Sequence, residues 1–260
     1  MPVLNLTNEA AKIAIDPASL DLSSLDMPAR QSAIETWRGR MVNEHVSARV
    51  FAALIPQMMR AEVDGARQAA VAEMIADELR HARQCAAVVV ALGGEAIADY
   101  PDIPPVPEHD DVPPLEALLR NVLSISCLSE TVAVALISSE RDDAGPAVLR
   151  ETLELILADE VRHARFGWRL LEELSEQLPA ATKQRLGAYL VAAFRELRAY
   201  ELAQLPARSA PSEAAEAVGV CDGHEARRLF FDTVSEVIIP GLEDHGIPAA
   251  VAWAASLEAA

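Results

Sequence analysis

Cysteine is scarce in this chain of 260 residues, and its three copies, Cys85, Cys127 and Cys221, form no Cys-x-x-Cys pair. An odd number of isolated cysteines argues against a disulfide framework and against a zinc or rubredoxin-type site. We read no apolar run of the roughly 18 to 20 residues that span a bilayer, and the first residues lack the features of a signal peptide. We therefore expect a soluble, cytoplasmic protein with no membrane partner.

Basic residues are also few, because 22 Lys and Arg stand against 40 Asp and Glu and give a formal net charge of −18. Nucleic-acid binding normally rests on clustered Lys and Arg that pair with phosphates. The acidic excess therefore argues against nucleic acid as a partner. It is typical of a solvated helical surface that keeps a protein soluble.

The residues that are abundant favour helix. Stretches rich in Ala, Leu, Glu and Arg have high helix propensity, and the clean apolar and polar alternation of a half-buried strand is missing. With 51% hydrophobic residues, the chain can bury a substantial core. We predict an all-α protein whose helices cover 28–61, 65–92, 113–142, 146–177, 180–205, 224–240 and 247–257.

Proline-rich segments divide the predicted helices. Residues 93–114 (GGEAIADYPDIPPVPEHDDVPP) cannot continue a helix and are too long for a tight turn. A four-helix bundle with one long crossover is the ferritin-like topology, so we predict that arrangement. Pro56 should kink or end the first long helix. The expected organisation is an N-terminal arm (1–27), a bundle with a fifth helix (28–205) and a C-terminal helical extension (206–260).

An internal repeat is the strongest signal in the sequence. ADELRHAR at 76–83 and ADEVRHAR at 158–165 differ at one position in eight. Each copy contains Glu-x-x-His, and helical residues three apart lie on one face with Cβ atoms about 5–6 Å apart. Glu78 with His81, and Glu160 with His163, can therefore each present an oxygen and a nitrogen to one metal centre.

Two further glutamates lie on apolar helical stripes. Glu44 and Glu130 each stand at helical spacing from hydrophobic residues, so each carboxylate points toward the expected core. His45 follows Glu44 but lies about 100° round the helix, so we expect it to be peripheral. The stripes are Trp37, Met41, Ala48, Phe51 and Ile55 around Glu44, and Leu123, Cys127, Val134 and Ile137 around Glu130.

Four carboxylates buried together require compensation, because desolvation and mutual repulsion both oppose their ionisation. Two divalent cations would balance the four charges. An oxygen-rich set with one imidazole per metal suits iron or manganese better than zinc or copper. Asp77 and Asp159 are candidate acceptors for the second N–H of each histidine, and Arg80 and Arg162 are available to pair with these aspartates or with surface acids.

These motifs resemble the ferritin-like di-iron carboxylate superfamily. The Asp-Glu-x-Arg-His repeats are similar to those of the ribonucleotide reductase small subunit and of bacterial multicomponent monooxygenases, and the resemblance covers roughly residues 28–177. It implies that the Glu of each Glu-x-x-His bridges both metals while the lone Glu of each half binds terminally. The implied assignment is Glu78 and Glu160 bridging, Glu44 terminal with His81, and Glu130 terminal with His163.

The resemblance implies two iron ions that activate O2, with manganese an option at one or both positions. Our leading prediction is an oxidase or monooxygenase that acts on a small organic substrate and takes electrons from an external donor. One alternative is iron handling, either as a ferroxidase or as a peroxide scavenger similar to rubrerythrin. Another is a non-enzymatic interaction protein stabilised by metal. The oligomeric state is open, with a homodimer as one option.

Overall fold

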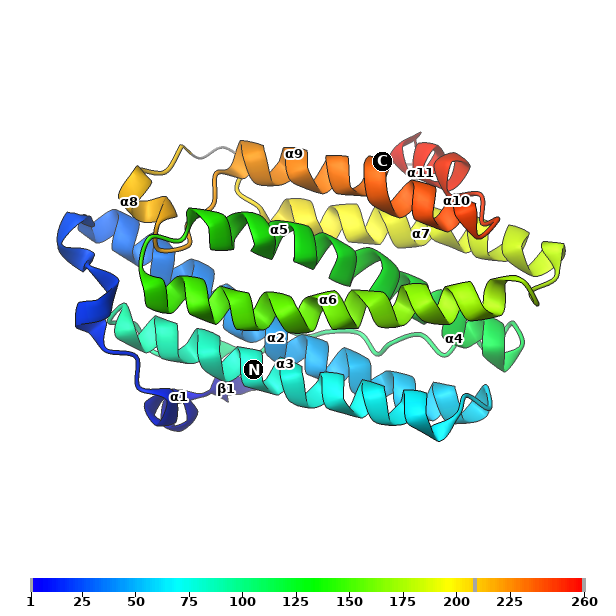
Figure 1. Cartoon of the computed structure of the whole chain (residues 1–260), viewed down its shortest axis with the longest axis horizontal. Helices are drawn as coiled ribbons and strands as arrows, with labels where there is room; N and C mark the ends of the chain where they lie inside the picture. The colour runs from blue at the N-terminus through cyan, green and yellow to red at the C-terminus, as the bar shows by residue number, and fades with distance from the viewer. Residues whose placement is uncertain (1, 208–209, 259–260) are drawn as a thin grey trace.

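Four long helices lie side by side along the long axis of the molecule (Figure 1). The computed structural model describes residues 2–207 and 210–258. Helix α2 packs on α3, α5 packs on α6, and α3 also contacts α6. The predicted all-α bundle is confirmed, and the predicted bounds of α2, α3 and α6 agree with the structure within two residues. The bounds are α2 (Met27–Arg60), α3 (Gly65–Ala91), α5 (Glu130–Asp143) and α6 (Ala147–Ser175).

Local chemistry explains where α2 and α3 begin. Asp26 accepts a hydrogen bond from the Ala29 N–H, and Asp64 accepts hydrogen bonds from two N–H groups of the first turn of α3. Of the two effects expected of Pro56, a kink or an end of the helix, the second does not occur, because α2 continues to Arg60. Leu54 and Met58 on either side of Pro56 are buried, and their packing holds the last turn in place.

The connection after α3 runs along α2. Arg38 Nε donates to the Glu95 carbonyl (3.2 Å), and Arg49 Nη2 donates to the Ile103 carbonyl (3.1 Å). Further along the same helix, Gln57 Nε2 donates to the Pro107 carbonyl at 3.2 Å. Three side chains spaced along α2 therefore donate hydrogen bonds to successive carbonyls of the connection, which runs from one end of the bundle toward the other. The predicted long crossover is confirmed.

The N-terminal arm contains regular structure that the sequence did not reveal. Strand β1 (Val3–Asn5) pairs antiparallel with β2 (Ile97–Asp99) of the crossover, and helix α1 (Thr7–Ile13) packs on α3. Two 3₁₀ turns follow, η1 (Pro17–Leu20) and η2 (Leu22–Ser24). Strands of three residues are too short to show alternation, and their pairing depends on a distant partner.

A π-helical turn interrupts the third predicted helix. The chain forms α4 (Pro114–Val122), the π-helical segment η3 (Leu123–Ser129) and then α5. The Ser129 hydroxyl donates to the Ser124 carbonyl at 3.1 Å, and the Ser124 hydroxyl lies 2.6 Å from the Tyr189 hydroxyl. A π turn changes the helical phase, and such turns occur frequently at functional sites. This one ends immediately before Glu130.

Gly167 allows α6 to approach η3 closely. A Cβ at this position would lie 2.5 Å from Ser126 Cβ and 3.0 Å from Cys127 Sγ. We expect Gly167→Ala to displace η3, to lower the free energy of unfolding by about 1–3 kcal/mol and to reduce metal binding by Glu130. Gly39→Ala is the control, since a Cβ there has no neighbour within 4 Å. Urea unfolding and metal analysis test this, and equal behaviour of the two variants would contradict it.

Most of the remaining helices cover the α5 side of the bundle (Figure 1), whereas α8 contacts α2. Helix α9 contacts α5, and α11 contacts α7. The helix predicted at 224–240 is split by a second π-helical segment, η4. The proposed division into arm, bundle and extension stays a prediction. The bounds are α7 (Ala180–Gln204), α8 (Glu213–Glu216), α9 (Gly223–Thr233), η4 (Val234–Ile238), α10 (Ile239–Asp244) and α11 (Ala249–Glu258).

The continuous helical segment Pro114–Asp143 is long and apolar enough to cross a membrane by length and composition alone. This differs from the expectation that no run reaches that length. The core helix of a soluble protein passes the same test. The segment brings Glu130 to the glutamates of three neighbouring helices, so it lies inside the bundle. Packing against those helices accounts for its apolar character. The absence of a membrane partner stays a prediction.

Two clusters of buried side chains enclose the middle of the bundle. On α2, Trp37 and Met41 belong to one cluster, and Phe51 and Leu54 belong to the other. Glu44 lies between them in the sequence. The Glu-x-x-His motifs of α3 and α6 also fall between residues of the same two clusters. The hydrophobic core therefore leaves one polar layer, and all four long helices contribute to it.

Candidate metal centre

The structure brings all six sequence-predicted ligands together in that polar layer. Each is buried, and the two histidines are fully buried. Glu44 comes from α2, Glu130 begins α5, and the two repeats supply the rest from α3 and α6. The six residues are Glu44, Glu78, His81, Glu130, Glu160 and His163.

Two overlapping sets of four residues can each hold one metal ion. In each set the candidate ligand atoms lie within 4.8 Å of one another. Glu78 and Glu160 belong to both sets, which is the arrangement that two bridging carboxylates would have. The first set is completed by Glu44 and His81, and the second by Glu130 and His163.

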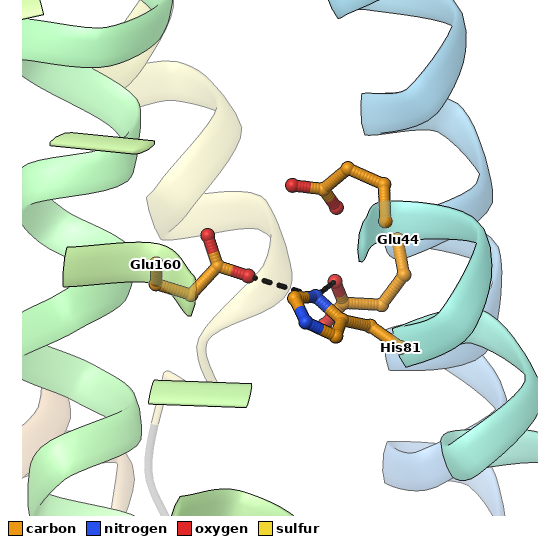
Figure 2. Close-up of side chains that lie close together, drawn as sticks. Glu44, His81 and Glu160 are labelled. Carbon is orange, nitrogen blue, oxygen red and sulfur yellow. Dashed lines mark ion pairs between the residues drawn. The ribbon is translucent and has the colours of Figure 1, made fainter. Parts of the chain in front are cut away.

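The inner nitrogen of each histidine faces the glutamates. His81 Nδ1 lies 3.4 Å from Glu44 Oε2 and 3.2 Å from Glu160 Oε1. Figure 2 shows Glu160 reaching from α6 toward His81 of α3, with Glu44 of α2 on the other side. His163 Nδ1 lies 3.0 Å from Glu78 Oε1. Each histidine therefore contacts a glutamate from the opposite repeat.

The outer nitrogens bind the predicted aspartates, in a crossed pattern. His81 Nε2 lies 3.0 Å from Asp159 Oδ2, and His163 Nε2 lies 3.3 Å from Asp77 Oδ2. Each aspartate thus holds the histidine of the other repeat, which fixes the ring and leaves Nδ1 facing inward. The predicted arginines join the same network, because Arg80 and Arg162 each form ion pairs with both aspartates.

Burial and the crowding of charged groups raise the pKa of two glutamates and two histidines in this layer. Burial and the neighbouring carboxylates of Glu160 and Glu44 raise the pKa of Glu78 well above its ordinary value. Burial and Glu160 do the same for Glu130. Burial opposes a charged imidazole, but the carboxylates of Glu160 and Glu44 outweigh it and raise the pKa of His81 to about 11. The pKa of His163 is also raised.

Buried polar atoms without a hydrogen-bond partner indicate that this layer can bind metal. Glu78 Oε1 and His81 Nδ1 are buried and make no aligned hydrogen bond, despite the close contacts described above. Buried polar atoms without a partner are rare in native proteins and call for an unseen ion or water. Each four-residue set contains three carboxylates and one imidazole, and the two sets share two of the carboxylates. This composition fits a di-metal site.

Metal binding is expected to release protons at pH 7, because the raised pKa values of Glu78, Glu130, His81 and His163 favour their protonated forms in the metal-free protein, and each must lose its proton to coordinate. Metal affinity should therefore fall as pH falls. Titration calorimetry with Mn²⁺, in buffers of different ionisation enthalpy, measures the number directly. Release of less than one proton would contradict this assignment of charge.

A cavity of about 430 Å³ opens onto the site. Its lining includes Glu44, Glu78, Glu130 and Glu160, and its other walls come from α2, α5 and the end of α7. Sequence reasoning missed this feature, because α7 carries no motif that marks it. Glu201 lines the cavity, and burial raises its pKa to about 7. His45 lies elsewhere, packed edge-on against Tyr100, as its peripheral assignment predicted.

Long paired helices, one crossover and this inward layer define a ferritin-like helical bundle. A protein from Synechococcus, "Protein 19 with aldehyde deformylating oxidase activity", has a similar fold, with a TM-score of 0.62. The alignment covers 90% of this chain and 98% of that chain at 20% sequence identity. At that identity the likeness shows the fold alone. A scan against protein-family profiles finds no match, and a search of curated proteins finds none either.

Proposed function

We propose that this chain is a di-iron carboxylate oxidoreductase that uses O2 to act on a small organic substrate. The observation that carries the proposal is the pair of four-residue sets that share Glu78 and Glu160. Two ferrous ions held in this way supply electrons for the activation of O2 when bound. Manganese suits the same donors, so a mixed site is within the proposal.

The protein's own residues would position the ions and protect them. Glu44 and His81 would hold one ion, Glu130 and His163 the other, and the two bridging glutamates both. Asp77 and Asp159 orient the imidazoles through hydrogen bonds to Nε2. The hydrophobic clusters close the polar layer on two sides, so the cavity is the side from which small molecules would reach the ligands.

The cavity favours an organic substrate over iron storage. A space of about 430 Å³ beside four candidate ligands is larger than a path for single ions requires, and it is within the usual range of small-molecule sites. The oxidase activity named for the structural neighbour supports the same class of reaction. An external electron donor and a cytoplasmic location belong to the same proposal.

Oxygen uptake tests the proposal. Anaerobically iron-loaded protein, mixed with O2 and a chemical reductant, should consume O2 faster when a suitable organic substrate is present. Glu78→Ala should abolish this uptake. Iron accumulation far beyond two ions per chain would instead indicate a ferroxidase and overturn the proposal. Helical content that depends on metal, without any O2 uptake, would indicate a structural site.

A further inference from the structure

Helix α2 lines the cavity beside the candidate metal centre with a row of side chains that can donate hydrogen bonds. The row has four members at spacings of three and four residues, so they share one face of the helix. Its three uncharged side chains form no hydrogen bond within the described part of the chain. Their donors are therefore available to a molecule in the cavity. The four residues are Thr36, Arg40, Asn43 and Ser47.

The guanidinium of Arg40 is held in place with one nitrogen unused. Its Nη2 forms an ion pair with Glu140 of α5, and its central carbon lies 5.0 Å from the centre of the Trp37 ring. Trp37 is itself fixed, because its Nε1 donates to the Val218 carbonyl at 2.8 Å. Nη1 of Arg40 is buried and has no hydrogen-bond partner among the residues that the structure describes. A buried charged donor without an acceptor is costly, and an oxygen atom of a ligand would remove that cost.

The charges around the cavity accept an anion once metal is bound. Two divalent ions would balance the four candidate glutamate ligands, so the floor of the cavity would then carry no net negative charge. Of the other acidic residues that line it, Glu140 is paired with Arg40 and Glu35 is exposed to solvent. Burial raises the pKa of Glu201 to about 7, so this side chain carries only part of a charge near neutral pH. Hydrogen bonds to an ionised oxygen are roughly twice as strong as those between neutral groups, so a carboxylate gains most from the donors of α2.

We propose that the cavity binds a small organic acid, whose carboxylate accepts hydrogen bonds from Nη1 of Arg40 and from Asn43. Its hydrocarbon part would lie against Ala133 and Ile137 of α5, which line the same cavity. Arg40 precedes the candidate ligand Glu44 by four residues, which is about 6 Å along the helix. The carbon atoms nearest the acid group would therefore lie beside the candidate metal centre. This inference rests on the proposed function and adds the class of substrate.

Three probes of equal chain length test the assignment: hexanoate, 1-hexanol and n-hexylamine. Each is titrated by calorimetry at pH 7 into anaerobic, iron-loaded protein. Hexanoate should bind at least about tenfold more tightly than either of the others, because it alone offers an ionised oxygen to the donors of α2. Hexanol or hexylamine binding as tight as that of hexanoate, or no binding of hexanoate, would overturn the proposal.

Two variants isolate the contribution of the guanidinium: Glu140→Gln, and the double variant Arg40→Gln/Glu140→Gln. Both lack the Glu140 charge, so neither leaves that carboxylate buried without its partner, and they differ only at Arg40. The double variant should bind hexanoate at least about tenfold more weakly than Glu140→Gln does, while hexanol binding changes by less than about twofold. Equal hexanoate affinity in the two variants would mean that the acid binds iron directly, and would overturn the role of Arg40.

Arg49→Gln is the matched control, because Arg49 is exposed on the same helix and does not line the cavity. It removes the same charge and should leave all three affinities unchanged. Circular dichroism identifies a variant that fails to fold, in which case the order of the three probes on the unaltered protein decides. Metal analysis of the same samples separates the two claims. Iron that loads normally while hexanoate binding ignores Arg40 removes only the substrate class, whereas iron that fails to load into the unaltered protein removes the di-iron function itself.

Discussion

Replacing Glu78 or Glu160 by Ala is expected to remove both metal ions, whereas replacing Glu44 or Glu130 removes one. Glu78 and Glu160 belong to both ligand sets, so the loss of either removes one ligand from each site and leaves each with one histidine and two glutamates. Glu44 and Glu130 each belong to one set. Metal content after anaerobic iron loading, measured by plasma mass spectrometry, should fall from two ions per chain to near zero or near one, respectively.

Glu116→Ala supplies the control for this series. Glu116 is also a buried glutamate, but its carboxylate is bound by Arg185 Nε at 2.9 Å, on a different part of the fold. The variant should lose stability and keep both metal ions. Equal metal loss in all five variants would mean that unfolding, rather than ligand removal, explains the result. Unchanged metal content in Glu78→Ala would contradict the shared role of that carboxylate.

Metal loading is expected to raise thermal stability strongly. An ion that binds only the folded state at hundredfold excess over its dissociation constant stabilises by about 2.7 kcal/mol. Two such ions would contribute about twice that, and each kcal/mol shifts Tm by about 2–4 °C in a domain of this size. Differential scanning calorimetry with and without a chelator measures the shift. Glu78→Ala should show almost none of it.

The stabilisation by metal should grow as pH rises from about 5 to 8. The raised pKa values of Glu78 and Glu130 mean that the folded, metal-free protein holds protons that the unfolded chain releases. The free energy of unfolding of the metal-free protein therefore falls as pH rises toward those raised pKa values. Over the same pH range metal binds more tightly, because fewer protons compete for the ligand atoms. A gap in Tm that narrows with rising pH would contradict the charge state assigned to these carboxylates.

Much of the fold and all six candidate ligands could be predicted from the sequence, and the reason is periodicity. The two Glu-x-x-His repeats identify one face of α3 and of α6. Glu44 is recognisable because a carboxylate at helical spacing from Trp37 and Phe51 must point into the core. The bounds of the long helices follow from capping residues such as Asp26 and Asp64.

Other features depend on contacts that a one-dimensional pattern does not contain. The π-helical segment before Glu130 is stabilised by Tyr189 of another helix and requires Gly167 on α6. Strand β1 forms only because β2 lies beside it. The crossed pairing of His81 with Asp159 needs the relative position of two helices. Glu201 looks like an ordinary surface residue until α7 places it in the cavity.

The most direct test of the di-metal site is a crystal structure of the iron-loaded protein with anomalous diffraction data collected at the iron edge. The account predicts two anomalous peaks about 3.5–4 Å apart, both in contact with Glu78 and Glu160. One peak should lie against Glu44 and His81, and the other against Glu130 and His163. A single peak, or iron bound outside this layer while the six side chains keep their mutual contacts, would contradict it.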